Sequence, residues 1–201
     1  MQKLFYVIIF VVLISFFIGA REANSEQYDQ NNRKWPTCIG EICFMKKLPD
    51  SSFFVKKYGR GECEMDLEET LHCYNDSEAK LFVKIWSDND SPSSIFGILI
   101  SNMPNCKKAG KPFKPFEKLK TAEGLVVGDS YKKVIELYGM PLFIKKGTEL
   151  KDLQAEYLNK LYKKMEFDVA LGYGPGGDEL LFSWIFIKRG KVKAILVGVF
   201  E

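Results

Sequence analysis

Hydrophobic and polar residues repeat along this chain with two different periods, and each period predicts a different kind of element. Two segments place apolar residues at helical spacing after an Asp or Ser and end in Tyr-Gly. The first begins at residue 50 or 51 and ends at Gly59, and the second begins at residue 129 or 130 and ends at Gly139. Asp and Ser cap helix N-termini and glycine suits the left-handed conformation at helix ends, so both segments are predicted to be short helices.

Short runs rich in branched and aromatic residues predict β-strands. The predicted strands cover residues 71–74, 81–86, 95–100, 142–147, 165–171, 179–188 and 191–200. Arg189 and Gly190 separate the last two runs, and a two-residue connection of this kind predicts a tight hairpin. Apolar residues at helical spacing also predict a helix over residues 151–164.

The order of a helix followed by several strands occurs twice, which predicts a tandem repeat. A stretch rich in lysine, glycine and proline at residues 105–115 separates the two copies and is typical of a connection. The predicted fold class is α+β, with two tandem units at residues 37–115 and 116–201, each with short helices packed on an antiparallel β-sheet. A single domain with one continuous sheet is the alternative.

The predicted C-terminal hairpin is apolar on both faces. A sheet that is covered on only one face alternates apolar with polar residues, so something must cover the second face as well. Either the chain itself covers that face, or an aromatic surface is left open for a partner. In the second case Trp86, Trp184 and Phe186 are the predicted partner-binding residues, because aromatic side chains dominate the binding energy of protein interfaces.

The N-terminus has the order of a secretory signal. Lys3 precedes an apolar run, and the small residues Gly19 and Ala20 follow it. Residues 1–20 are therefore predicted to be a signal peptide, and the polar residues 21–36 a disordered tether. An uncleaved signal anchor is the alternative, although the apolar run is shorter than a spanning helix needs. The mature protein is expected to be secreted or periplasmic, with no membrane span after signal cleavage.

Five cysteines follow the predicted signal, all within the first predicted unit at residues 37–115. Export to an oxidising compartment makes disulfides their expected state, with two bonds and one leftover thiol. The spacing alone leaves the pairing open. Cys73 with Cys106 and Cys38 with Cys43 are the favoured candidates, which would leave Cys63 unpaired. Because the spacings contain no CxxC pair, no metal site is expected, and no cofactor is predicted.

The charge of the chain is small and mixed in sign. Its formal net charge is +3, and lysines are interspersed with acidic residues. Nucleic-acid-binding domains cluster their Lys and Arg residues, so no nucleic-acid partner is expected. Residues 107–114 are locally basic and are interpreted as a solvated linker.

A short motif of the second predicted unit resembles known exported bacterial domains. The residues that carry it are Gly128-Asp129-Ser130, Val134, Tyr138-Gly139 and Pro141. The motif is similar to that of the outer-membrane-assembly lipoproteins of the SmpA/OmlA type and to the tandem-repeat fold of β-lactamase inhibitory proteins. The chain lacks the lipidated cysteine of the first group and has a strong motif only once, unlike the second. The resemblance implies a protein that binds other proteins through a sheet surface.

Residues that could carry catalysis are scarce. His72 is the only histidine, and the adjacent Cys73 would point to the opposite face of a strand, so neither a Ser-His-Asp nor a Cys-His arrangement is expected. Residues 172–178 are glycine-rich but precede a strand rather than a helix, so they are interpreted as a flexible connection and not as a phosphate loop. Sequence neighbours among the carboxylates are interpreted as solvated loop charges. These pairs are Glu62 with Glu64, Glu68 with Glu69, and Asp178 with Glu179.

These observations favour a non-catalytic, exported protein-binding module, such as an inhibitor or an envelope accessory protein, that acts through a sheet surface. The expected partner is another protein, and no catalytic residue is predicted. A structural envelope protein without a soluble partner is one alternative. A carboxylate-dependent hydrolase that needs no histidine is the other.

Overall fold

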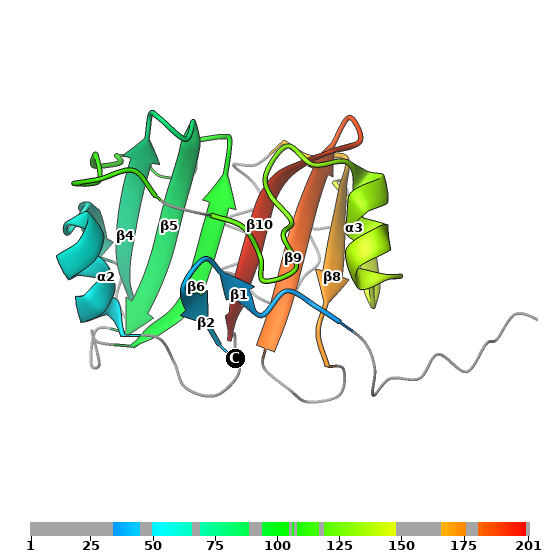
Figure 1. Cartoon of the computed structure of the whole chain (residues 1–201), viewed down its shortest axis with the longest axis horizontal. Coiled ribbons are helices and arrows are strands. Elements are labelled where there is room, and N and C mark those ends of the chain that lie inside the picture. The colour runs from blue at the N-terminus through cyan, green and yellow to red at the C-terminus, as the bar shows by residue number, and fades with distance from the viewer. Residues whose placement is uncertain are drawn as a thin grey trace, which may run out of the picture. The chain divides into compact units, whose positions relative to one another are not determined.

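An antiparallel sheet of eight strands organises the chain in the computed structural model (Figure 1). The structure describes residues 34–44, 50–65, 69–88, 94–104, 106, 108–116, 119–147, 166–175 and 181–199. Residues 34–201 form one compact unit, to which the whole sheet belongs.

The elements follow each other in a simple order along the chain. The first hairpin consists of β1 (Cys38–Ile39) and β2 (Ile42–Cys43), and helix α2 (Ser51–Tyr58) comes next. Four strands follow: β3 (Glu62–Met65), β4 (Glu69–Asp76), β5 (Leu81–Asp88) and β6 (Ile95–Ser101). Helix α3 (Tyr131–Tyr138) precedes the last four: β7 (Phe143–Lys146), β8 (Val169–Tyr173), β9 (Leu181–Lys188) and β10 (Lys191–Val199). Their spatial order in the large sheet is β3-β4-β5-β6-β10-β9-β8-β7.

The first four strands of the large sheet, β3 to β6, pair with the last four, β7 to β10, through β6 and β10. Strands β6 and β10 pair antiparallel at the centre of the sheet, with Leu99 opposite Leu196 and Ile98 opposite Val197. Both strands are buried on both faces, which explains why their sequences read as nearly continuous apolar runs.

The prediction of an α+β fold with two units, each packing helices on its own sheet, is wrong. The strands form a single sheet, and only two helices of eight residues each occur among the described residues. The structure therefore matches the alternative of one continuous sheet. Hydrophobic patterns identify strands but not the edges that pair, and the pairing of β6 with β10 is the step that the pattern could not supply.

Each face of the sheet has its own apolar core, because successive side chains of a strand point to opposite faces. The first face carries Ile98, Ile195 and Ile185, together with residues of both helices. Figure 1 shows α2 and α3 at opposite ends of the sheet, with the first hairpin between them. The second face carries eight buried residues. They are Leu71, Trp86, Leu99, Ala170, Trp184, Phe186, Ala194 and Leu196.

Both predicted helices are confirmed, with their caps. The Asp50 carboxylate accepts a hydrogen bond from the Ser52 N–H at 2.7 Å, and the Ser130 hydroxyl accepts one from the Lys133 N–H at 3.2 Å. Each helix ends at a glycine with positive φ, 88° at Gly59 in α2 and 71° at the equivalent position after α3. A left-handed backbone is strained for other residues, so the Tyr-Gly signal identified both ends.

The predicted hairpin at Arg189 and Gly190 is confirmed. Both residues have positive φ, 50° and 69°, as a tight turn between β9 and β10 requires. The Asp168 carboxylate accepts a hydrogen bond from the Arg189 N–H at 2.6 Å, which ties the turn to the residue just before β8.

Several local elements differ from the sequence-based expectations. Strand β3 and the hairpin of β1 and β2 were not predicted, because both are short and rich in charged or small residues. Strand β8 begins at Val169 and extends to Tyr173, later than the predicted run. The helix predicted at residues 151–164 lies outside the described residues.

The N-terminal predictions lie mostly outside the described part of the chain, which begins at Lys34. The last residues of the predicted tether belong to the folded unit. Trp35 packs against the core of the first face, and the Pro36 carbonyl accepts a hydrogen bond from the buried Ser183 hydroxyl. Within the described ranges, no helix has the length and apolar character needed to cross a bilayer.

Candidate functional site

The three aromatic residues predicted to bind a partner are buried. Trp184 is 5% exposed, and Trp86 and Phe186 have no exposed surface. All three lie in the core of the second face, where Phe186 contacts Phe167 with ring centroids 5.2 Å apart. As they stand, none offers its ring to another molecule, so a contact surface has to be sought elsewhere.

An apolar cavity of about 260 Å³ opens on the first face of the sheet. It lies between the β1–β2 hairpin and helix α2, and Ile98 of the central strand β6 is part of its lining. Its other apolar residues are Ile39, Ile42, Phe53, Phe54, Tyr58, Phe116 and Leu119. Glu41 and Asp50 are its charged lining residues. Concave apolar sites with few polar groups are typical of binding sites.

The hairpin that borders the cavity is too short to be stable alone and is fastened at several points. The disulfide between Cys38 and Cys43 joins its two strands. The Gly40 N–H donates to the Lys120 carbonyl at 2.8 Å, and Ile39 forms a bridge with Thr121. This wall of the cavity is therefore set before any partner arrives.

Helix α2 supplies the opposite wall and places an aromatic ring at the rim. Phe53 is 58% exposed although it lines the cavity. The Lys57 ammonium lies 5.8 Å from the centroid of the Phe53 ring and donates to the Glu41 carboxylate at 2.5 Å. The hydrogen bond to Glu41 raises the pKa of Lys57 above its ordinary value. The ion pair links the helix to the hairpin across the mouth of the cavity.

Aromatic side chains form the base of α2. Phe54, Tyr58, Tyr74 and Phe116 pack as one cluster, with the Tyr58 and Phe116 ring centroids 4.4 Å apart and those of Tyr74 and Phe116 5.4 Å apart. The Tyr74 hydroxyl donates to the Gly59 carbonyl at 2.7 Å, which ties the end of the helix to strand β4. The cluster holds α2 in place beside the cavity.

Residues 108–116, which we call the basic loop, run beside α2 and are fixed rather than loose. The Phe113 N–H donates to the Tyr58 carbonyl at 2.8 Å, and the Phe116 N–H donates to the buried Asp76 carboxylate at 2.6 Å. Gly110 exchanges backbone hydrogen bonds with strand β4. The lysines of this stretch are exposed, as expected of a solvated linker, but its backbone is hydrogen-bonded to α2 and β4.

The basic loop presents one ring to solvent. Phe113 is 81% exposed, the largest value among the exposed large apolar residues that the structure describes. Its ring lies against Gly59, where an added Cβ would come within 2.9 Å of it. The sequence offered one signal for this arrangement: the order Lys-Pro-Phe-Lys-Pro-Phe, in which two prolines restrict the backbone around an exposed and a buried phenylalanine.

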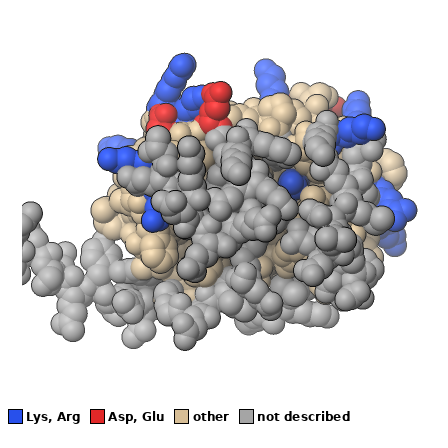
Figure 2. Space-filling view, turned by 180° about the vertical axis from the view of Figure 1, so that it is seen from behind, with Lys and Arg blue, Asp and Glu red and all other residues tan. Residues whose placement is uncertain are grey.

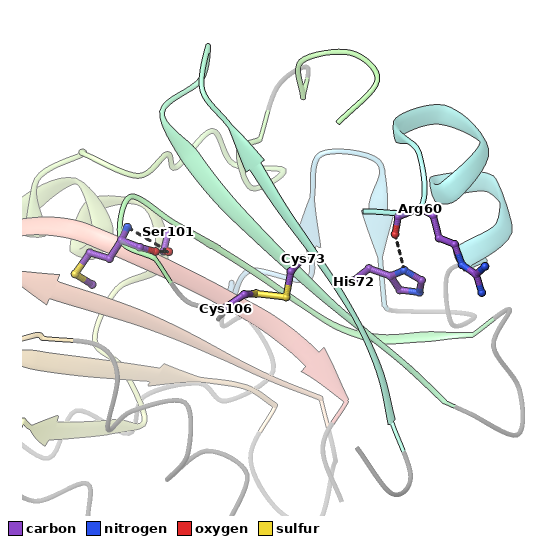
Figure 3. Close-up of a disulfide and its surroundings, with 6 residues drawn as sticks. Arg60, His72, Cys73, Ser101 and Cys106 are labelled. Carbon is purple, nitrogen blue, oxygen red and sulfur yellow. Dashed lines mark hydrogen bonds between the residues drawn. A yellow bond between two sulfur atoms is a disulfide. The ribbon is translucent and has the colours of Figure 1, made fainter. Parts of the chain in front are cut away.

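Both favoured disulfides are present. Cys73 is bonded to Cys106, which ties strand β4 to the segment after β6 (Figure 3). Cys38 is bonded to Cys43. Cys63 lies in β3, opposite His72 in the register of the sheet.

His72 does not meet the neighbouring cysteine. Figure 3 shows the Cys73 side chain directed toward Cys106 and the His72 ring directed toward Arg60. The ring Nδ1 lies 3.1 Å from the Arg60 carbonyl oxygen, and the residue is buried. This is a structural histidine with its backbone partner in place.

Other candidates for chemistry do not converge. Among the described residues, no three His, Cys, Asp or Glu side chains gather as a metal site would require. Glu62 and Glu64 lie in strand β3 rather than in a loop, and the other two carboxylate pairs fall wholly or partly outside the described residues. Gly172 belongs to β8, where the Trp184 ring approaches to 3.0 Å of a Cβ built on it, so its role is close packing and not flexibility.

Charges on other parts of the surface are mixed in sign. In the view from behind, Lys and Arg side chains project along the margins, and Asp or Glu side chains stand beside some of them (Figure 2). On helix α3 the lysines are paired: Lys133 with Asp129 at 2.8 Å and Lys132 with Glu136 at 3.4 Å.

The chain matches no protein-family model, no curated protein and no solved structure. The resemblance to exported bacterial domains of the SmpA/OmlA and β-lactamase-inhibitory types stays a prediction.

Proposed function

We propose that this protein is a non-catalytic, exported binding module that accepts an apolar side chain of a partner polypeptide in the cavity between the β1–β2 hairpin and α2. The observation that carries the proposal is the cavity itself, with its apolar lining and the exposed Phe53 at its rim. The contact surface differs from the sheet surface expected from the sequence, because both faces of the sheet are buried cores.

The size of the cavity suits one side chain better than a large ligand. An apolar cavity of about 150 Å³ holds benzene, whereas drug-sized ligands occupy clefts of about 300–1,000 Å³. A volume of about 260 Å³ therefore fits an aromatic or long aliphatic side chain. Phe53 would extend the contact beyond the cavity, since aromatic residues around a buried anchor are typical of interface hot spots.

A displayed library of random peptides, sorted on the immobilised full-length protein, tests the proposal. Retained peptides are expected to share an aromatic or long aliphatic residue. Leu119→Trp fills the cavity from its partly buried edge and should abolish that preference. Lys132→Trp adds the same ring on the exposed surface of α3 and is the matched control, which should leave the preference intact.

Two results would contradict the proposal. Sorting could yield no peptide with a shared apolar residue, or the retained peptides could bind the Leu119→Trp variant as tightly as the wild type. Thermal unfolding of each variant shows whether it remains folded, so that loss of binding is not confused with loss of structure.

A further inference from the structure

Lysines gather on α2 and the basic loop, whereas the acidic residues Glu41 and Asp50 line the cavity itself. Residues 51–60, which include α2, and the basic loop at 108–116 contain no Asp or Glu. Their cationic residues are Lys56, Lys57, Arg60, Lys108, Lys111 and Lys114. Of these, Lys57 pairs with Glu41, whereas Lys56, Lys108, Lys111 and Lys114 are exposed residues. A concentration of one sign of charge raises the local concentration of oppositely charged partners.

The exposed ring of this surface is held in a defined position. Phe113 sits between Pro112, which is buried, and Lys114, and its N–H is bonded to the Tyr58 carbonyl. Its ring packs on Gly59 while most of its surface faces solvent. A contact residue fixed before binding loses less conformational entropy when it binds. Phe113 does not contribute to the buried core, so we interpret its exposed ring as a contact residue for a partner.

We propose that the partner is acidic: a polypeptide surface whose carboxylates face the lysines of the basic loop and α2, and whose apolar pocket takes the Phe113 ring. This inference rests on the proposed function, because it names the chemistry of the partner that fills the adjacent cavity. The partner inserts a side chain into the cavity, and this protein inserts Phe113 into the partner. Carboxylates of the partner bind around both contacts.

An anionic lipid surface is the other ligand that lysines and an exposed aromatic ring can meet. The cavity argues against it, because a bilayer surface supplies no side chain to fill a concave site. A surface that carries both a projecting ring and a cavity is complementary to an irregular protein surface, not to a flat one.

The acidic partner is tested by sorting the same peptide library on three full-length proteins and counting Asp and Glu in the retained peptides. The proteins are the wild type, the Lys111→Gln/Lys114→Gln variant, and the Lys132→Gln/Lys191→Gln variant, which removes the same charge from exposed positions elsewhere. Acidic residues should be enriched on the wild type and on the control, and not on the first variant. A retained acidic peptide should bind that variant about three- to tenfold more weakly, since two exposed ion pairs are lost.

The apolar and acidic preferences are separate readouts of the sorting. On Leu119→Trp the apolar preference should disappear while the enrichment for acidic residues persists. If the cavity proposal fails, the acidic preference can therefore still be observed. If the acidic preference is absent, the apolar preference can still be observed. Phe113→Ala should weaken acidic binders without changing the enrichment for acidic residues.

Equal Asp and Glu content on all three proteins, or affinity that does not fall as salt is raised, would overturn the inference. Phe113-dependent sedimentation with phosphatidylglycerol vesicles, but not with phosphatidylcholine vesicles, in the absence of acidic enrichment would also overturn it and identify lipid as the ligand.

Discussion

The two halves of the sheet have the same order of elements but different surfaces. The first half, α2 to β6, and the second half, α3 to β10, each place an eight-residue helix before four strands. In the first half the helix borders a cavity and an exposed ring, and it carries the exposed Lys56 beside Lys57, which pairs with Glu41. In the second half the helix carries paired charges, and the Val134 side chain is fully buried. Both halves expose apolar side chains, among them Phe53 in the first and Phe143 in the second, so the difference lies in the cavity beside α2 and in the paired charges of α3.

The halves are also stabilised by different interactions. The first half has an aromatic cluster beneath its helix and both disulfides lie in or near it. The second half relies on a polar network: the Tyr138 hydroxyl bonds to Thr121 and donates to the Glu123 carboxylate at 2.8 Å. Aromatic packing thus holds α2 to the sheet, whereas a hydrogen-bonded tyrosine anchors the end of α3.

The largest expected effect concerns the aromatic cluster. Phe116→Ala removes a ring that contacts Phe54, Tyr58 and Tyr74, and should lower the free energy of unfolding by about 3–5 kcal/mol. Val134→Ala is the smaller truncation beneath α3 and should cost less, because it removes fewer atoms. Urea unfolding measures both. Equal losses would show that the two helices depend on packing to the same degree.

The second expected effect concerns the Cys73–Cys106 disulfide, which closes a separation of 33 residues. Replacing both residues by serine should cost about 3–4 kcal/mol, because the unfolded chain gains freedom. The midpoint in urea should fall accordingly. A reductant should lower the midpoint of the wild type at least as much, because it also breaks the Cys38–Cys43 bond. An unchanged midpoint in the reductant would contradict the role given to the disulfides.

The third expected effect is alkaline sensitivity of the second half. Burial raises the pKa of both Tyr138 and Tyr173 above the ordinary value for a phenol. In the unfolded chain these phenols ionise near pH 10, whereas burial keeps them protonated to higher pH in the folded chain. Their contribution to the free energy of unfolding is therefore present below about pH 10 and is lost as the pH rises above it.

Tyr138→Phe tests this dependence. The substitution should cost about 1 kcal/mol at neutral pH, because it removes one buried hydrogen-bonded hydroxyl. The free energy of unfolding of the variant should also decrease less steeply with pH between about pH 10 and 12. The stability of each protein measured against pH would show this, and parallel curves for variant and wild type would rule out Tyr138 as a source of the dependence.

The smallest expected effect concerns the charge pair at the start of α3. Burial acts to raise the pKa of Asp129, but hydrogen bonds from Lys133 and from the Val126 N–H outweigh it and hold the pKa below its ordinary value. The stabilisation is therefore present above about pH 4 and is lost as the pH falls through the folded-state pKa. Asp129→Asn should cost about 0.5–1 kcal/mol at pH 7 and nothing at pH 2. A cost that persists at pH 2 would indicate lost packing instead.

Local signals in the sequence predicted the local structure well. Capping residues and Tyr-Gly identified both helices, and Arg189-Gly190 identified the last hairpin, because these signals depend on backbone conformation within a few residues. The residues of β9 alternate between the two faces as a strand requires, with Ile185 and Ile187 in the core of the first face and Trp184 and Phe186 in that of the second.

Long-range features could not be read from the same patterns. Pairing of β6 with β10 joins residues about a hundred positions apart, and either strand could have been an edge. The candidate site escaped prediction for a related reason. Its cavity forms between a hairpin of two-residue strands and a helix, and neither shows in its own sequence that a hollow lies between them. The sequence left open whether the aromatic residues of the predicted strands are covered or face a partner, and the structure shows Trp86, Trp184 and Phe186 buried.

The central position of β10 has a consequence for how the protein is made. During synthesis β6 is produced long before β10, its neighbour at the centre of the sheet. The apolar edge of β6 therefore stays unpaired until β10 has been produced. Such an edge is a template for pairing between chains. Newly made molecules are therefore most vulnerable to association in the interval before β10 has been produced.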